Sequence, residues 1–188
     1  MNYPMYVKFR VFFSQFSVYD AYGNYICFVK KELFKLKEII HVYKEREMKT
    51  TLFTIKADRV IDFSAIYTFY DQNVQEIGSI KRHGKKSIWR ANFDIYLDEG
   101  KTITINEDNV AKRFLNIIVS QFLLGGLFFH PSYTFRREDG TPVYKVSKQT
   151  SLFGNKFKIE LLEEMPESEE MKVLLGAFVL LVLERPRG

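Results

Sequence analysis

Most of the chain alternates apolar and polar residues, which is the pattern of a β-strand with one buried face. In the first run, residues 5–13, Val7 and Phe9 share one face while Lys8 and Arg10 share the other. Asp, Gly and Asn suit tight turns and separate later runs, for example at residues 20–24. The pattern predicts about twelve strands and two helices. The remaining strands are predicted at residues 16–31 (a hairpin), 38–44, 51–57, 64–71, 76–82, 88–97, 101–105, 132–149 (a hairpin with its turn at 138–141) and 155–164.

The C-terminal stretch has no polar face. Every residue from 173 to 183 is apolar except Gly176, and a helix that is apolar on all sides lies inside a protein or a membrane. This run is too short to cross a bilayer, which needs about 20 residues. Ser168 is the predicted helix cap and Pro186 the predicted stop. We therefore predict a closed antiparallel β-barrel around a central hydrophobic C-terminal helix.

Three segments of the chain repeat the same unit, a hairpin followed by a return strand. Apolar residues recur at the same offsets in each copy, and chance is a weak explanation for agreement across five columns in three copies. The columns are Val18, Phe69 and Phe135; Ile26, Ile77 and Val143; Val29, Ile80 and Val146; Ile40, Ala91 and Phe157; Val42, Phe93 and Ile159. This repeat supports a barrel built from similar units.

An insertion at residues 106–130 separates the second copy from the third. Asn106 or Asp108 is suited to cap a helix there, and the apolar residues that follow have helical spacing: Val110, Phe114, Ile117, Ile118 and Phe122. We predict one extra amphipathic helix. Two roles stay open for it, as a plug in one mouth of the barrel or as an interfacial membrane helix.

Composition limits the class of protein. With 188 residues the chain suits one domain, residues 1–188. Its net charge of +5 fits an acidic partner, such as an anionic lipid surface or nucleic acid, without requiring one. A single cysteine, Cys27, excludes an internal disulfide and favours a reducing compartment. The N-terminus lacks the continuous apolar core of a signal peptide. We expect a cytoplasmic location.

The sequence shows few groups for catalysis. His41, His83 and His130 are scattered without metal-ligand spacing. Cys27 lies between Ile26 and Phe28, which favours a buried, inert thiol. Neither a Gly-rich phosphate loop nor a GxSxG motif is present. We therefore expect no enzyme activity, no metal site and no cofactor.

A basic cluster around Gly84 and beside Trp89 is the strongest candidate binding site. It comprises Lys81, Arg82, Lys85, Lys86 and Arg90. A solvated turn explains such a run simply, whereas contact with anionic lipid headgroups is the functional interpretation. Nucleic-acid binding is disfavoured because the aromatic residues keep the strand period. A second basic set is diluted by glutamates: Lys30, Lys31, Lys35, Lys37, Lys44, Arg46 and Lys49.

The hairpin segments FSVYDAYGNYICFVKK, YTFYDQNVQEIGSIKRH and YTFRREDGTPVYKVSKQ, with the closing run VLLGAFVLLVL, resemble the tubby C-terminal-like superfamily. Within it, they are similar to the LURP-one-related proteins of bacterial type, with phospholipid scramblases as distant relatives. The resemblance implies a twelve-stranded closed barrel threaded by the C-terminal helix, and it marks residues 106–130 as an insertion atypical of the family.

Together these features predict a non-enzymatic binding or structural module. The resemblance to lipid-binding tubby domains suggests peripheral association with anionic phospholipid at the inner face of the membrane. The alternatives are a nucleic-acid-binding module and a protein scaffold without a small-molecule ligand. The sequence does not name a protein partner.

Overall fold

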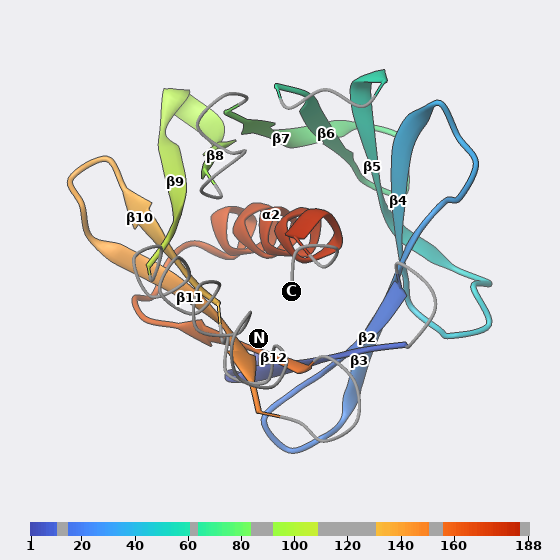
Figure 1. The fold of residues 1–188 in the computed structure, drawn as a ribbon, viewed down its shortest axis with the longest axis horizontal. Helices are drawn as coiled ribbons and strands as arrows, with labels where there is room; N and C mark the ends of the chain where they lie inside the picture. The colour runs from blue at the N-terminus through green and yellow to red at the C-terminus, as the bar shows by residue number, and fades with distance from the viewer. Residues whose placement is uncertain (11–14, 61–63, 84–91, 109–130, 151–155, 185–188) are drawn as a thin grey trace, which may run out of the picture.

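The computed structural model describes residues 1–10, 15–60, 64–83, 92–108, 131–150 and 156–184. In these residues, twelve strands form a closed antiparallel barrel in which neighbours pair in chain order and β1 closes on β12 (Figure 1). This confirms the predicted barrel. The strands are β1 (Met5–Phe9), β2 (Gln15–Tyr19), β3 (Tyr25–Lys31), β4 (Lys37–Tyr43), β5 (Thr51–Val60), β6 (Ile66–Tyr70), β7 (Glu76–Arg82), β8 (Asn92–Tyr96), β9 (Thr102–Glu107), β10 (Ser132–Arg137), β11 (Pro142–Gln149) and β12 (Lys156–Leu161).

The alternating pattern decides which face of each strand is buried. In β1, Met5, Val7 and Phe9 are buried, while Tyr6 and Lys8 are exposed. The inward side chains of the strands and those of the C-terminal helix form one apolar cluster. Because each fully buried large side chain contributes about 1.5–3 kcal/mol, this shared core holds the barrel and the helix together.

The helix α2 (Glu167–Glu184) contains the apolar C-terminal stretch, and its residues 173–182 are all buried. The Phe178 ring lies 5.6 Å from the Phe16 ring of β2, while Gly176 packs against Ile95 of β8. β2 and β8 belong to opposite parts of the ring, and Figure 1 draws α2 between them. The predicted cap is wrong: α2 begins at Glu167, so Ser168 lies inside the first turn.

Three charged side chains near the start of α2 are buried, and each is paired with a group outside the helix. Pairing offsets the cost of removing these charges from water. The pairs are Glu169 Oε1 with Lys101 Nζ at 3.3 Å, Glu170 Oε1 with the Tyr3 hydroxyl at 2.9 Å, and Lys172 Nζ with Asp98 Oδ2 at 2.5 Å. They fix the start of α2 against the β8–β9 connection and the N-terminal segment.

The internal repeat corresponds to three structural units, which run from β2 to β4, from β6 to β8 and from β10 to β12. Strand pairing corrects the predicted alignment of the second unit by two residues, because its return strand places Ile95, and not Phe93, opposite Ile80. The equivalent facing pairs are Val29 with Val42, Ile80 with Ile95, and Val146 with Ile159. A shift of two residues keeps the same face buried, so the apolar pattern could not detect it.

The helix predicted in the 106–130 insertion has its apolar positions at residues 110–122, which lie outside the described residues. Asn106, one of its two predicted caps, lies instead in β9 and pairs with Thr134 of β10. Asp108, the other predicted cap, follows Glu107 at the end of β9 and accepts a hydrogen bond from the Thr134 hydroxyl at 2.9 Å. Asn106 is therefore an extended strand residue, and the barrel continues to this point.

Antiparallel pairing in chain order makes the connections alternate between the two ends of the barrel. The connections that follow odd-numbered strands lie at one end, here named the loop end. Those that follow even-numbered strands lie at the other, the turn end. The turn end includes the short helix η2 (Asp98–Gly100) and the start of α2. This arrangement decides which charged residues share a surface.

Candidate functional site

Two residues of the predicted basic cluster lie in the described part of the chain. Lys81 and Arg82 are the last residues of β7, at the loop end. Lys81 is half-buried and faces Asp94 of β8 across the sheet. The other three members, Lys85, Lys86 and Arg90, lie outside the described residues.

Arg82 packs into the barrel wall instead of facing solvent. It is only 8% exposed, and its guanidinium carbon lies 5.8 Å from the centre of the Phe93 ring. The strand period explains this position, because Arg82 follows the buried Ile80 by two residues and so shares its face. A role in headgroup binding therefore rests on the other four residues of the cluster, and for them it stays a prediction.

The β3–β4 loop, residues 32–36, presents apolar side chains that the sequence interpretation did not single out. Leu33, Phe34 and Leu36 are all exposed. The available signal was an apolar run between two strands, flanked by lysines. The second basic set of the sequence includes only the lysines of this segment, and glutamates dilute their charge.

The carboxylates of Glu32, at the start of this loop, and of Glu38, just after it, both contact neighbouring side chains. Glu32 Oε1 lies 2.7 Å from His41 Nε2, and this hydrogen bond lowers the pKa of Glu32. Glu38 pairs with Lys31 and accepts a hydrogen bond from the Tyr67 hydroxyl. Glu32 also pairs with Lys35, whose Nζ lies 3.6 Å from Glu32 Oε2. These contacts hold the base of the loop, while Lys35 and Lys37 stay exposed.

Positive charge gathers at the loop end. In the described chain, the loop-end connections and the two strand residues on each side of them carry eleven lysines or arginines and four acids. The basic residues are Lys8, Arg10, Lys30, Lys31, Lys35, Lys37, Arg59, Lys81, Arg82, Lys148 and Lys156, and the acids are Glu32, Glu38, Glu107 and Asp108. Of these, Lys30 directs its amine to Met48 in the β4–β5 connection of the turn end. This end of the barrel is therefore cationic.

Negative charge gathers at the turn end. Its connections, the two strand residues on each side of them and the first six residues of α2 carry fifteen acids and seven basic residues. The acids are Asp20, Glu45, Glu47, Asp71, Glu76, Asp98, Glu99, Glu138, Asp139, Glu160, Glu163, Glu164, Glu167, Glu169 and Glu170, and the basic residues are Lys44, Arg46, Lys49, Lys101, Arg136, Arg137 and Lys172. The two ends of the barrel thus carry opposite charge.

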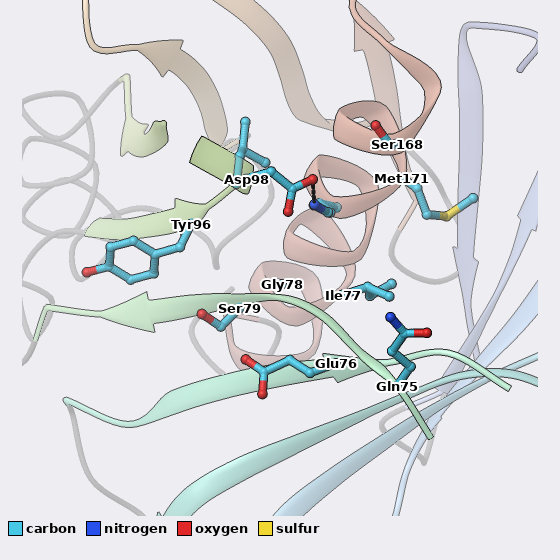
Figure 2. Close-up of a pocket in the computed structure, with 11 residues that line it drawn as sticks. Gln75, Glu76, Ile77, Gly78, Ser79, Tyr96, Asp98, Ser168 and Met171 are labelled. Atoms are coloured by element: carbon cyan, nitrogen blue, oxygen red, sulfur yellow. Dashed lines mark hydrogen bonds and ion pairs between the residues drawn. The ribbon is translucent and has the colours of Figure 1, made fainter. Parts of the chain in front are cut away.

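An open hollow of about 740 Å³ lies at the turn end between β7, β8 and α2 (Figure 2). Figure 2 shows the Asp98 carboxylate directed toward α2, where it pairs with the buried Lys172, and the Tyr96 ring directed away. Because this buried cation already has a carboxylate partner and the surrounding surface is acidic, the hollow does not favour an anionic ligand. Its lining residues are Gln75, Glu76, Ile77, Gly78, Ser79, Tyr96, Leu97, Asp98, Ser168, Met171 and Lys172.

Other candidate chemistry is sparse in the described residues. Cys27 is 3% exposed, and burial raises the pKa of its thiol to about 12, so at neutral pH it is the unreactive thiol form. No group of three or more His, Cys, Asp or Glu side chains in the described part of the chain could hold a metal ion. Among these residues, no helix combines the length and the apolar character that a membrane crossing requires.

A closed twelve-stranded barrel with a buried C-terminal helix is the architecture that the sequence resemblance implied. A family model described as LURP-one-related matches residues 26–169, from β3 to the first turn of α2. The chain belongs to the LURP-one-related family. No curated protein and no solved structure shows significant similarity to it. The family assignment confirms the main part of the resemblance, whereas the link to bacterial-type members and to scramblases stays a prediction.

Proposed function

We propose that this LURP-one-related protein is a non-enzymatic binding module that docks peripherally on anionic phospholipid through its loop end. The separation of charge between the two ends of the barrel carries this proposal. An anionic surface attracts the cationic loop end and repels the acidic turn end, so the charge distribution favours one orientation. Each lysine or arginine near such a surface contributes about 1 kcal/mol.

The packing inside the barrel favours a binding site on the outer surface instead of one in the interior. The helix packs against β2 on one side and β8 on the other, and we propose that it occupies the centre of the barrel. Apolar side chains then fill the space that a substrate would need. The hollow beside Asp98 is open and acidic. We therefore propose a binding role without catalysis, at the cytoplasmic face of a membrane.

A comparison of two double variants with equal loss of charge tests the proposal. Lys37→Gln with Lys156→Gln removes two exposed lysines from the loop end, while Lys44→Gln with Lys49→Gln removes two from the turn end. Co-sedimentation with phosphatidylcholine vesicles, with and without phosphatidylserine, measures the affinity. We expect the loop-end variant to bind anionic vesicles at least about tenfold more weakly, and the turn-end variant to bind like the parent.

Salt and nucleic acid provide the contrasting measurements. Binding should weaken as salt rises, because the screening length falls to about 10 Å at 0.1 M. Equal losses in the two variants, or no sedimentation with any vesicle, would contradict an oriented lipid-binding module. A shift of nucleic acid that depends on the loop-end lysines would favour the nucleic-acid alternative. No binding to either ligand would leave the protein-scaffold interpretation.

The predicted basic cluster is tested in the same assay. Lys81, Lys85 and Lys86 are changed to Gln together, while Arg82 is kept because it packs against Phe93. A loss of binding to anionic vesicles would assign headgroup contact to these lysines. If the triple variant binds like the parent while the loss at Lys37 and Lys156 persists, the cluster is a solvated turn.

A further inference from the structure

Three large apolar side chains are exposed within four consecutive residues of the β3–β4 loop. Leu33 is 47% exposed, Phe34 is 103% exposed and Leu36 is 79% exposed. Single exposed apolar residues are normal on protein surfaces, whereas a contiguous apolar group indicates an interaction site. Val60, 49% exposed, extends the group, because β5 ends there directly opposite Lys37 of β4.

Nothing in the described part of the fold explains the choice of phenylalanine at residue 34. At φ 63° its backbone is left-handed, a conformation that suits Gly or Asn and is unusual for a bulky residue. Its full exposure means that the ring gains no burial within the described protein. A small or polar residue would suit both this backbone conformation and this exposure to solvent better than phenylalanine does. A partner that covers the ring would account for a phenylalanine at this position.

The loop is held firmly at its base, so its tip is presented and not collapsed onto the barrel. The Glu32 N–H donates to the Ile39 carbonyl at 2.8 Å, and Glu32 also lies 2.7 Å from His41 Nε2. Lys31 and Glu38 pair on the other side of the base. These contacts fix both arms of the loop and leave the apolar tip free.

We propose that the β3–β4 loop inserts Leu33, Phe34 and Leu36 into the headgroup boundary of an anionic bilayer. The proposal rests on the proposed function and adds how the protein is anchored and by which residues. Lysines lie beside the apolar tip: Lys35 is exposed, with its Nζ 3.6 Å from Glu32 Oε2, and the exposed Lys37 begins β4, with its Nζ 2.7 Å from the Asp58 carbonyl oxygen. Apolar side chains that enter the acyl boundary beside cations that reach headgroups are the pattern of interfacial membrane binding.

A bilayer fits this surface better than a protein partner because of its shape and charge. The apolar residues form a loop tip bordered by lysines at the cationic end of the barrel, whereas protein interfaces have cores depleted of charged residues, lysine among them. A second copy of the chain would bring two cationic loop ends together, and their repulsion opposes that contact. Self-association is therefore a contrary outcome of the test.

A fluorescent probe at the tip tests insertion directly. Phe34→Cys provides a thiol for an environment-sensitive NBD label, and the native Cys27 does not compete because it is buried. Val74→Cys is the matched control, because Val74 also has a left-handed backbone and an exposed side chain but lies at the turn end. With vesicles that contain phosphatidylserine, the label at residue 34 should shift to shorter wavelength and be quenched by lipids that carry a shallow doxyl group. The label at residue 74 should show neither change.

An unlabelled variant gives a second measurement. Phe34→Ser with Leu36→Ser should weaken vesicle binding at least about tenfold, because two large apolar side chains lose their burial in the bilayer. Tyr22→Ser with Val74→Ser, which changes two exposed residues of the turn end, should bind like the parent. Both variants should unfold as cooperatively as the parent, since none of the four side chains is buried.

The outcomes separate this inference from the function on which it rests. If the protein sediments with anionic vesicles but the label at residue 34 shows neither shift nor quenching, binding is electrostatic only and insertion is wrong. If nothing sediments, the lipid-binding function itself fails. If the parent is a dimer that becomes a monomer on Phe34→Ser with Leu36→Ser, the loop is a self-association surface and the proposal is overturned.

Discussion

The equivalent turns of the three repeated units share one backbone pattern and differ at its left-handed position. Asp20 N–H donates to Asn24 O at 2.9 Å, Asp71 N–H donates to Gln75 O at 3.0 Å, and Arg137 N–H donates to Thr141 O at 2.9 Å. Two of the turns have glycine at the residue with positive φ, Gly23 at 85° and Gly140 at 88°. The second turn has Val74 at 63°. A β-branched residue is strained there.

We predict that Val74→Gly stabilises the protein by about 1 kcal/mol. Relief of the left-handed strain, about 1–2 kcal/mol, exceeds the extra freedom that glycine gives the unfolded chain. Gly23→Ala is the reverse control, since a Cβ there meets no atom within 4 Å and only the backbone term changes. It should destabilise the protein. Urea unfolding measures both variants, and a less stable Val74→Gly would show that this turn is not strained.

The first of these turns also predicts how stability depends on pH. The Asn24 side-chain amide donates to Asp20, and with the backbone N–H groups of Asn24 and Tyr22 it lowers the pKa of Asp20 below the usual 3.8. A lowered pKa contributes stability that is present above the unfolded value and is lost as pH falls through the folded value. Urea unfolding should therefore show stability falling below about pH 4. Asp20→Asn should reduce this slope, and an unchanged slope would exclude Asp20 as its source.

Among the elements, α2 depends on one small residue for its close approach to the sheet. A Cβ at Gly176 would lie 2.4 Å from Ile95 Cδ1 and 2.9 Å from Ile95 Cγ1. Ile95 is fully buried, so its side chain has little room to move away. Glycine is unfavourable inside a helix by about 1 kcal/mol. Contact with β8 therefore decides this position against helix propensity.

We predict that Gly176→Ala destabilises the protein by roughly 1 kcal/mol, because crowding against Ile95 outweighs the gain in helix propensity. The sharper measurement is a double-mutant cycle. Ile95→Val alone should cost about 0.5–1.5 kcal/mol, but in the Gly176→Ala background it should stabilise, because it removes the nearest carbon. Additive effects of the two changes would mean that the helix shifts instead of clashing.

At the scale of the whole molecule, chain connectivity produces the division of charge. Segments far apart in the sequence, such as those that contain Lys37 and Lys156, meet at one end because each follows or precedes a loop-end connection. The acidic residues around Asp98, Glu138 and Glu163 meet at the other end for the same reason. A dipole of this kind orients a protein above a charged surface before any specific contact forms. The proposed function belongs to this scale.

The sequence alone determined the elements and their buried faces. Alternation with a period of two specifies which side of β1 or β7 is apolar, and an unbroken apolar run at residues 173–183 specifies a buried helix. These signals are local, so they survive without knowledge of strand partners. The period of β7 extends to Arg82 and so predicts its inward position. The prediction that it belongs to a solvent-facing basic cluster is therefore wrong for Arg82.

Only the tertiary structure decided the register of the second unit, the engagement of Glu32 and Glu38, and the gathering of charge at each end. A two-residue shift leaves the apolar pattern unchanged, so only strand pairing shows that Ile95 faces Ile80. Charged residues are solvated almost anywhere on a surface, so their order in the chain carries no signal of where they meet. The exposure of Phe34 likewise follows from its position at a loop tip that neighbouring strands leave uncovered.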